Sequence, residues 1–155
     1  MKKIVSILLL ITLTLLVACS GGVSRSQATD ATESFVSYIL EKDSHGALSL
    51  MHPDAAAVTT AEKCEAIVNA FTAAGVDFSA VPEYHYTGFR VSMYDSRYSG
   101  SGYELSGYII LGEIRVDVMS VVVSNDNGFG IYSINFDFPT DLPATEGDDG
   151  VASPL

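Results

Sequence analysis

The chain has 155 residues, of which 48% are hydrophobic, and a formal net charge of −11. This length suffices for one small domain with its own core. The acidic balance argues against nucleic acid as a partner and against electrostatic binding to anionic lipid headgroups, because both are themselves negatively charged. We favour the simpler interpretation that the excess of acidic residues keeps the folded domain soluble.

Residues 1–19 have the layout of an export signal. Lys2 and Lys3 precede an apolar run over 4–17, and a small residue and a cysteine follow it. As a helix, this run would span roughly 21 Å, against a hydrocarbon core of roughly 30 Å. It is short for a permanent anchor, so an uncleaved membrane helix is the less favoured alternative.

The segment Leu16-Val17-Ala18-Cys19 resembles a lipobox, the motif of bacterial lipoproteins whose cysteine is lipidated before a peptidase cuts in front of it. The resemblance implies removal of residues 1–18 and attachment to a membrane through lipid on Cys19. The alternative is an ordinary secretion signal with Cys19 as a chance neighbour. Ser20 stands where aspartate would imply inner-membrane retention, so the expected location is the outer membrane of a two-membrane source, or otherwise the outer face of the cell membrane.

Composition divides the rest of the chain into three parts. Residues 19–29 are predicted to be a flexible tether, and 30–138 the folded domain. Residues 139–155 are rich in Pro, Gly, Asp and Ala, which predicts a disordered acidic tail.

The first half of this domain has helical periodicity. Three helices are predicted, over about 30–42, 45–51 and 60–75. The first is expected to begin at Asp30, which resembles a helix cap. Cys64 shares helical spacing with neighbouring apolar residues, so a buried thiol is favoured over a reactive one.

From Tyr84 onward the period changes to two, which predicts four antiparallel strands. One face of the first strand is expected to carry His85, Thr87, Phe89, Val91 and Met93. The second and third strands are predicted over 103–111 and 114–123, and the Asn127-Gly128 pair favours a tight turn into a fourth. Helices followed by an antiparallel meander make an α+β domain.

This order of elements, with Phe35-Val36-Ser37-Tyr38-Ile39-Leu40 followed by Asp43 and Ala47-Leu48, resembles small lipoproteins of the NTF2-like, cystatin-like superfamily. The resemblance covers about 30–138. It implies N-terminal helices packed on a curved antiparallel four-stranded sheet that forms a cone. It also implies a homodimer through the open sheet face.

The sequence predicts no catalytic residue, no metal site and no cofactor. The three histidines lie at no spacing from one another or from a cysteine that suits a metal. His45 and His52 are expected in exposed turns. His85 either faces the cone as a candidate base or reaches water at a strand end, and the second is favoured. Asp117 is expected to form a surface ion pair with Arg115 or Arg90 across the sheet.

A group of tyrosines surrounds the first predicted hairpin: Tyr84, Tyr86, Tyr94, Tyr98 and Tyr103. If exposed together, they would suit a peptide, a glycan or a partner protein, because tyrosine combines a large contact area with a polar tip. The competing interpretation, which we favour, is that β-structure simply favours tyrosine.

These patterns predict a lipid-anchored, extracytoplasmic binding or envelope-associated module without catalysis. Its partners would be the membrane, through the anchor, and an envelope protein, a peptide or a small ligand. Two alternatives stay open: a small-ligand-binding sensor domain, and an NTF2-like enzyme of isomerase or dehydratase type with its site in the cone.

Overall fold

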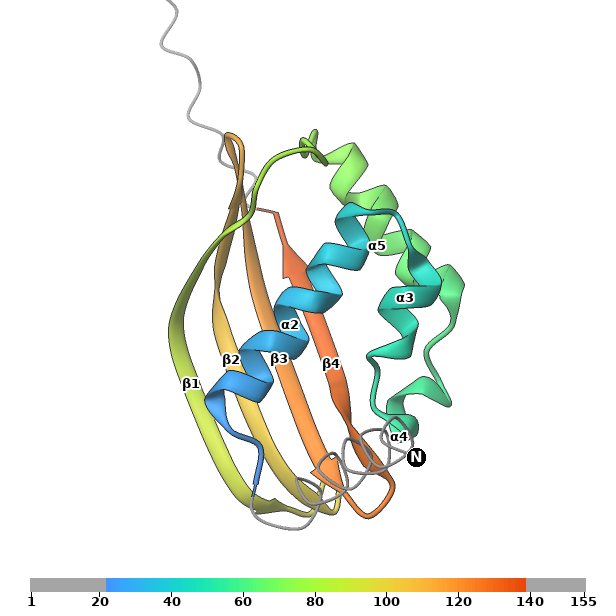
Figure 1. Ribbon diagram of the computed structural model, residues 1–155, viewed down its shortest axis with the longest axis vertical. Coiled ribbons are helices and arrows are strands. Elements are labelled where there is room, and N and C mark those ends of the chain that lie inside the picture. Colours follow the sequence, from blue (N-terminus) through green and yellow to red (C-terminus); the bar gives the residue numbers. More distant parts are fainter. Residues whose placement is uncertain (1–21, 139–155) are drawn as a thin grey trace, which may run out of the picture.

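The computed structural model describes residues 22–138. The predicted signal peptide, Cys19 and the tail 139–155 lie outside the described residues. Within them, helices come first and strands follow (Figure 1). The helices are α2 (Arg25–Leu40), α3 (Ser44–Ser49), α4 (Pro53–Ala56) and α5 (Ala61–Ala73), and the strands are β1 (Glu83–Asp95), β2 (Gly100–Leu111), β3 (Ile114–Asn125) and β4 (Gly128–Asp137).

The strands form one antiparallel sheet in the order β1-β2-β3-β4, so each strand pairs with its neighbour in sequence. Figure 1 shows the described helices on one face of this sheet, with α2 crossing the strands and α3 and α5 beside β4. The predicted α+β class and four-stranded antiparallel sheet are confirmed. We call the two sides of the sheet the helix-covered face and the open face.

Helix α2 begins earlier than the sequence analysis expected. Ser24 caps it: the Ser24 hydroxyl accepts a hydrogen bond from the backbone N–H of Gln27 at 3.2 Å, and the Gln27 side chain accepts one from the Ser24 N–H at 2.9 Å. This reciprocal arrangement satisfies two donors that a helix start leaves free. Residues 25–29 are therefore helical and not a flexible tether, and Asp30 lies inside the helix.

The core lies between the helices and the helix-covered face. Phe35 and Ile39 of α2 and Phe71 of α5 are completely buried. The ring of Phe71 meets that of Phe136 edge to face, with centroids 5.1 Å apart. The only polar pair that joins α2 to the middle of the sheet among the described hydrogen bonds links Thr32 to Ser120 at 2.7 Å, so both hydroxyls are satisfied in an apolar setting.

The alternation of side chains between the two faces of the sheet is interrupted in the middle of β1. Tyr86 pairs with Gly107 and Gly88 with Ser106, so Thr87 is an extra residue that forms a bulge. A bulge shifts the alternation of side chains by one position. His85 therefore lies on the open face, whereas Phe89 lies on the helix-covered side opposite Leu105. The expectation that His85, Phe89, Val91 and Met93 share a face was wrong.

Candidate functional site

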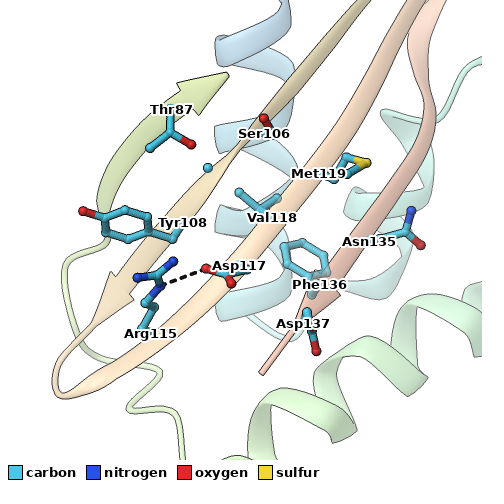
Figure 2. Close-up of a pocket in the computed structure, with 11 residues that line it drawn as sticks. Thr87, Ser106, Tyr108, Arg115, Asp117, Val118, Met119, Asn135, Phe136 and Asp137 are labelled. Carbon is cyan, nitrogen blue, oxygen red and sulfur yellow. Dashed lines mark hydrogen bonds and ion pairs between the residues drawn. The ribbon is translucent and has the colours of Figure 1, made fainter. Parts of the chain in front are cut away.

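The open face of the sheet carries a hollow of about 520 Å³. Figure 2 shows that its side chains come from neighbouring strands. Its main residues are Tyr108 of β2, Arg115, Asp117 and Met119 of β3, and Asn135 and Asp137 of β4. We call this set the open-face site. Register explains the assembly, because Tyr108, Asp117 and Asp137 occupy directly paired positions on three adjacent strands.

Tyr108 is the centre of the aromatic part of this site. The ring of His85 stacks on it, with centroids 4.7 Å apart and planes 17° from parallel. The guanidinium carbon of Arg115 lies 4.2 Å from the centre of the Tyr108 ring. A cation over an aromatic face is attracted by the ring quadrupole. His85 thus lies on the open face and not between helices and sheet, and its side chain is 46% exposed, so it reaches water as the favoured interpretation expected.

The charged part is an ion pair and a second carboxylate. Arg115 Nε donates to Asp117 Oδ1 at 2.8 Å. Asp117 thus pairs with the first of its two expected partners, Arg115 and not Arg90, and the pair lies along β3 and not across the sheet. Both side chains are about half exposed, so the pair itself contributes roughly 0.2–1 kcal/mol to stability. Asp137 lies opposite Asp117 in the register. The site therefore combines an aromatic plate, one cation and two carboxylates within reach of solvent, which suits recognition of a polar partner.

The five tyrosines considered as a possible interaction surface do not share one surface, because their side chains lie in different surroundings. Tyr98 and Tyr103 are buried, and Tyr94 is exposed. Tyr84 and Tyr86 are half-buried on the helix-covered side, where their rings stack with centroids 6.2 Å apart. The sequence analysis did not identify Tyr108, which contributes to the open-face site. Its alternation with the apolar Ile109 and its position opposite Asp117 in the hairpin could have indicated that it lies on the open face.

The hydroxyls of Tyr84 and Tyr86 point to Glu33 of α2. Tyr84 donates to the Glu33 carbonyl oxygen at 3.4 Å, and Tyr86 to the Glu33 carboxylate at 3.3 Å. Burial, followed by the nearby Glu33 charge, raises the pKa of Tyr84 to about 12. The same causes raise the pKa of Tyr86 further. Both phenols therefore stay neutral at ordinary pH and dock α2 on the sheet.

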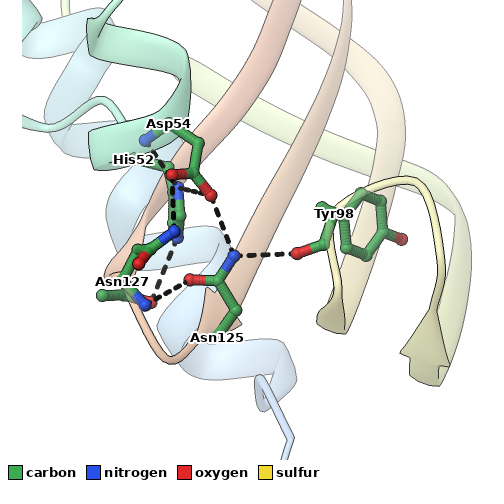
Figure 3. Close-up of polar contacts among 6 residues, drawn as sticks. His52, Asp54, Tyr98, Asn125 and Asn127 are labelled. Carbon is green, nitrogen blue, oxygen red and sulfur yellow. Dashed lines mark hydrogen bonds and ion pairs between the residues drawn. The ribbon is translucent and has the colours of Figure 1, made fainter.

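A polar network joins α4 to the β3–β4 hairpin (Figure 3). His52 is completely buried, so its expected exposed turn was wrong. Its Nδ1 accepts from the Asp54 N–H at 3.1 Å, and its Nε2 lies 3.1 Å from the Gly128 carbonyl oxygen. A carbonyl can only accept, so Nε2 carries the proton of a neutral imidazole.

Two asparagines of the hairpin complete this network. Asn125 donates to the Asp54 carboxylate at 3.0 Å and Asn127 at 2.8 Å. The Asn125 hydrogen bond lowers the pKa of Asp54 below its usual value; burial opposes this shift, and the Asn127 hydrogen bond reinforces it. Asn125 also donates to the Tyr98 carbonyl at 2.8 Å. These hydrogen bonds hold α4 against the β3–β4 hairpin and the β1–β2 turn. The polar side chains of the network are therefore used in packing.

Cys64 lies in the wall of a cavity of about 220 Å³ between α5 and β4. Its side chain is 1% exposed, and burial raises the pKa of its thiol. A buried neutral thiol is a poor nucleophile, so the predicted packing role is confirmed. Within residues 22–138, no three His, Cys, Asp or Glu side chains gather as a metal site would require.

None of the helices in the described part of the chain is long and apolar enough to cross a membrane. Comparisons of the chain with protein-family models, with curated proteins and with solved structures found no match.

Proposed function

We propose that this chain is a bacterial lipoprotein whose extracytoplasmic domain binds a protein or peptide of the cell envelope through the open-face site, without catalysis. The single observation that carries the binding role is the exposed group of Tyr108, Arg115 and Asp117 on the sheet face opposite the helices. The Leu16-Val17-Ala18-Cys19 segment supports the anchor.

A second observation favours this role over an enzyme with its site between helices and sheet. Phe35, Phe71 and Phe136 pack against one another in that space. His85, the candidate base, lies on the opposite face, stacked on Tyr108. A general base must lie within hydrogen-bond reach of its substrate, so His85 would act only on something bound to the open face.

The proposal includes an NTF2-like fold, with a sheet curved into a cone around the helices. Two features support it: the helices precede the strands, and they gather on one face of a four-stranded meander. Family analogy adds a homodimer through the open face, which would compete with an envelope partner for the same side chains. An experimental structure with a flat sheet would reject the cone.

The anchor is tested by intact-mass analysis of the membrane fraction, comparing the native chain with Cys19→Ala. The expected mass corresponds to cleavage before Cys19 plus acyl chains, and membrane retention should be lost in the variant. Two or more acyl chains make release from a bilayer very slow. An unmodified mature chain, or retention that does not depend on Cys19, would contradict the anchor.

The binding role is tested by placing a photo-crosslinking amino acid at Met119 in living cells, with Val58 as the control position. Both side chains are more than half exposed, but only Met119 belongs to the open-face site. We expect a discrete adduct from Met119 that Tyr108→Ala reduces about tenfold, because removal of one central aromatic residue typically costs an interface more than 1 kcal/mol. An adduct of twice the chain mass would identify the homodimer. Equal adducts from both positions would reject the site.

A further inference from the structure

An exposed apolar surface lies at the end of β1 that the N-terminal segment approaches. It consists of Phe89, Val91, Met93 and Tyr94, whose exposed fractions range from 48% to 76%. We call it the β1 apolar patch. Its four members lie within six residues of one strand, and such contiguous apolar groups on a protein surface mark interaction sites. The open-face site uses none of them.

The chain before α2 lies directly against this patch. A side-chain carbon added at Gly22 would be 3.1 Å from Ser101 and 3.9 Å from the sulfur of Met93. Val23 is buried, and Ser24 caps α2. The guanidinium of Arg25 lies 5.8 Å from the centre of the Phe89 ring. The start of the described chain is therefore held at the Met93 end of the sheet.

The length of chain up to Cys19 restricts where a lipid on that residue can be. Only Ser20 and Gly21 separate Cys19 from Gly22. Consecutive Cα atoms are about 3.8 Å apart, so the Cα of Cys19 lies within about 11 Å of that of Gly22. An acylated Cys19 must have its chains in the bilayer, which brings the Met93 end of β1 to the membrane surface.

Resting on the proposed anchor, we infer that the β1 apolar patch is a membrane-contact surface that inserts Met93 and Tyr94 into the headgroup and acyl boundary of the bilayer holding Cys19. Apolar and aromatic side chains enter this boundary to a depth of roughly 5–10 Å. Phe89 lies four residues further along the strand, about 13 Å from Met93 at 3.3 Å per residue, so the Met93 end of the patch reaches deepest.

The remaining features of this end of the molecule agree with a bilayer as occupant. Phe129, at the start of β4, is also exposed, and its partner Ser124 pairs in turn with Ser101 beside Gly22. Tyrosine suits the interface because its ring is apolar and its hydroxyl remains hydrated. The acidic net charge predicts that the contact depends on apolar insertion and not on anionic lipid.

The absence of tryptophan from the chain permits a direct test. The full chain is expressed with its own signal, purified in detergent and reconstituted into phosphatidylcholine vesicles with or without brominated acyl chains, which quench indole fluorescence on contact. Tyr94→Trp reports on the patch. Val81→Trp is the matched control, because Val81 is 84% exposed and precedes the opposite end of β1, about 40 Å away along a strand of this length.

We expect brominated lipid to quench Tyr94→Trp about twofold or more and to leave Val81→Trp nearly unchanged, because quenching requires insertion to acyl depth. Met93→Trp should behave like Tyr94→Trp and guards against a local effect of one substitution. Equal quenching at positions 94 and 81 would overturn the contact. A second copy of the chain is the other possible occupant of the patch. It would shift the Tyr94→Trp emission to the blue as protein concentration rises in detergent, and brominated lipid would not quench that emission. This result would overturn the membrane contact.

Flotation of the same vesicles separates this inference from the proposed anchor. Protein that floats with the vesicles, but whose Tyr94→Trp fluorescence is not quenched, retains the anchor and refutes the patch. Protein that does not float because its Cys19 carries no lipid refutes the anchor, and the membrane-contact inference falls with it.

Discussion

His52 holds two backbone groups that would otherwise be buried without partners. Its ring accepts from the Asp54 N–H and lies 3.1 Å from the Gly128 carbonyl oxygen, while the Asp54 carboxylate holds both asparagines of the hairpin. A buried polar group without a hydrogen-bond partner lowers the stability of the folded state by roughly 1–3 kcal/mol. One side chain therefore determines how α4 sits on the β3–β4 hairpin.

His52→Ala should lower the free energy of unfolding by roughly 2–4 kcal/mol, because it removes a helix cap and leaves the Gly128 carbonyl without its partner. His45→Ala is the matched control: His45 is exposed in α3, and surface changes of this kind stay within about 0.5 kcal/mol. Urea denaturation of both variants measures the difference. Equal effects at the two histidines would contradict the structural role of His52.

The phenols against Glu33 make stability depend on alkaline pH. The pKa of Tyr84 is about 12 in the folded chain, against an ordinary value of 10.0. A raised pKa of this kind adds stability that is fully present below pH 10 and is lost as pH rises through about 12. Tyr84→Phe should therefore flatten the fall in melting temperature between pH 10 and 12. An unchanged slope would show that Tyr84 ionises freely in the folded state.

Helix α2 illustrates competition between two capping patterns at the scale of the element. Both Ser24 with Gln27 and Asp30 with Glu33 have the spacing of a capping pair. The structure uses the first, because a start at Ser24 buries Val23 and Ala28 against the core. The extra turn also carries the chain to Gly22 and so decides which end of the sheet is closest to Cys19.

Replacing the two caps in turn distinguishes them. Ser24→Ala should lower the free energy of unfolding by about 1 kcal/mol, the usual loss for a helix cap. Asp30→Ala should change it by less than about 0.5 kcal/mol, because Asp30 is an exposed residue inside the helix and alanine has a higher helix propensity. Thermal unfolding followed by circular dichroism measures both. The reverse order of effects would place the helix start at Asp30.

At the scale of the domain, residues 22–138 cover one face of the sheet with helices and leave the other face open. The described helices all cover the same side of the sheet (Figure 1), and the largest buried side chains lie between them and the strands. Stability and the proposed binding role are therefore carried by opposite faces. This separation is what an antiparallel sheet with one solvated side allows.

Substitutions on the two faces should have separable effects. Phe71→Ala, in the core, should lower the free energy of unfolding by about 3–5 kcal/mol. Tyr108→Ala, in the open-face site, should lower it by about 1 kcal/mol or less, because that ring is partly exposed. The same variant should reduce the adduct formed from Met119 about tenfold. Chemical denaturation and the crosslinking yield are measured on the same variants. Loss of the fold in Tyr108→Ala would show that the open face is structural.

The sequence alone predicted the order of the three longer described helices and the four strands, and therefore the α+β class. It also predicted the burial of Cys64 and an ion pair of Asp117 with Arg115 or Arg90, of which the structure forms the first. These features depend on neighbouring residues: a periodicity near 3.6 or 2, and a turn signal at Asn127-Gly128 that the structure places one residue earlier, at Asp126-Asn127. Such signals come from residues close together in the sequence, so they can be recognised without the tertiary structure.

Only the tertiary structure decided how distant residues share space. The bulge at Thr87 reverses the facing of β1 and places His85 and Phe89 on opposite sides of the sheet. The hydrogen-bond partner of His52 Nε2 is the carbonyl oxygen of Gly128, 76 positions along the chain. The tyrosines divide among core, helix contact and surface for the same reason: burial depends on what packs from elsewhere in the chain, and residue type alone does not specify it.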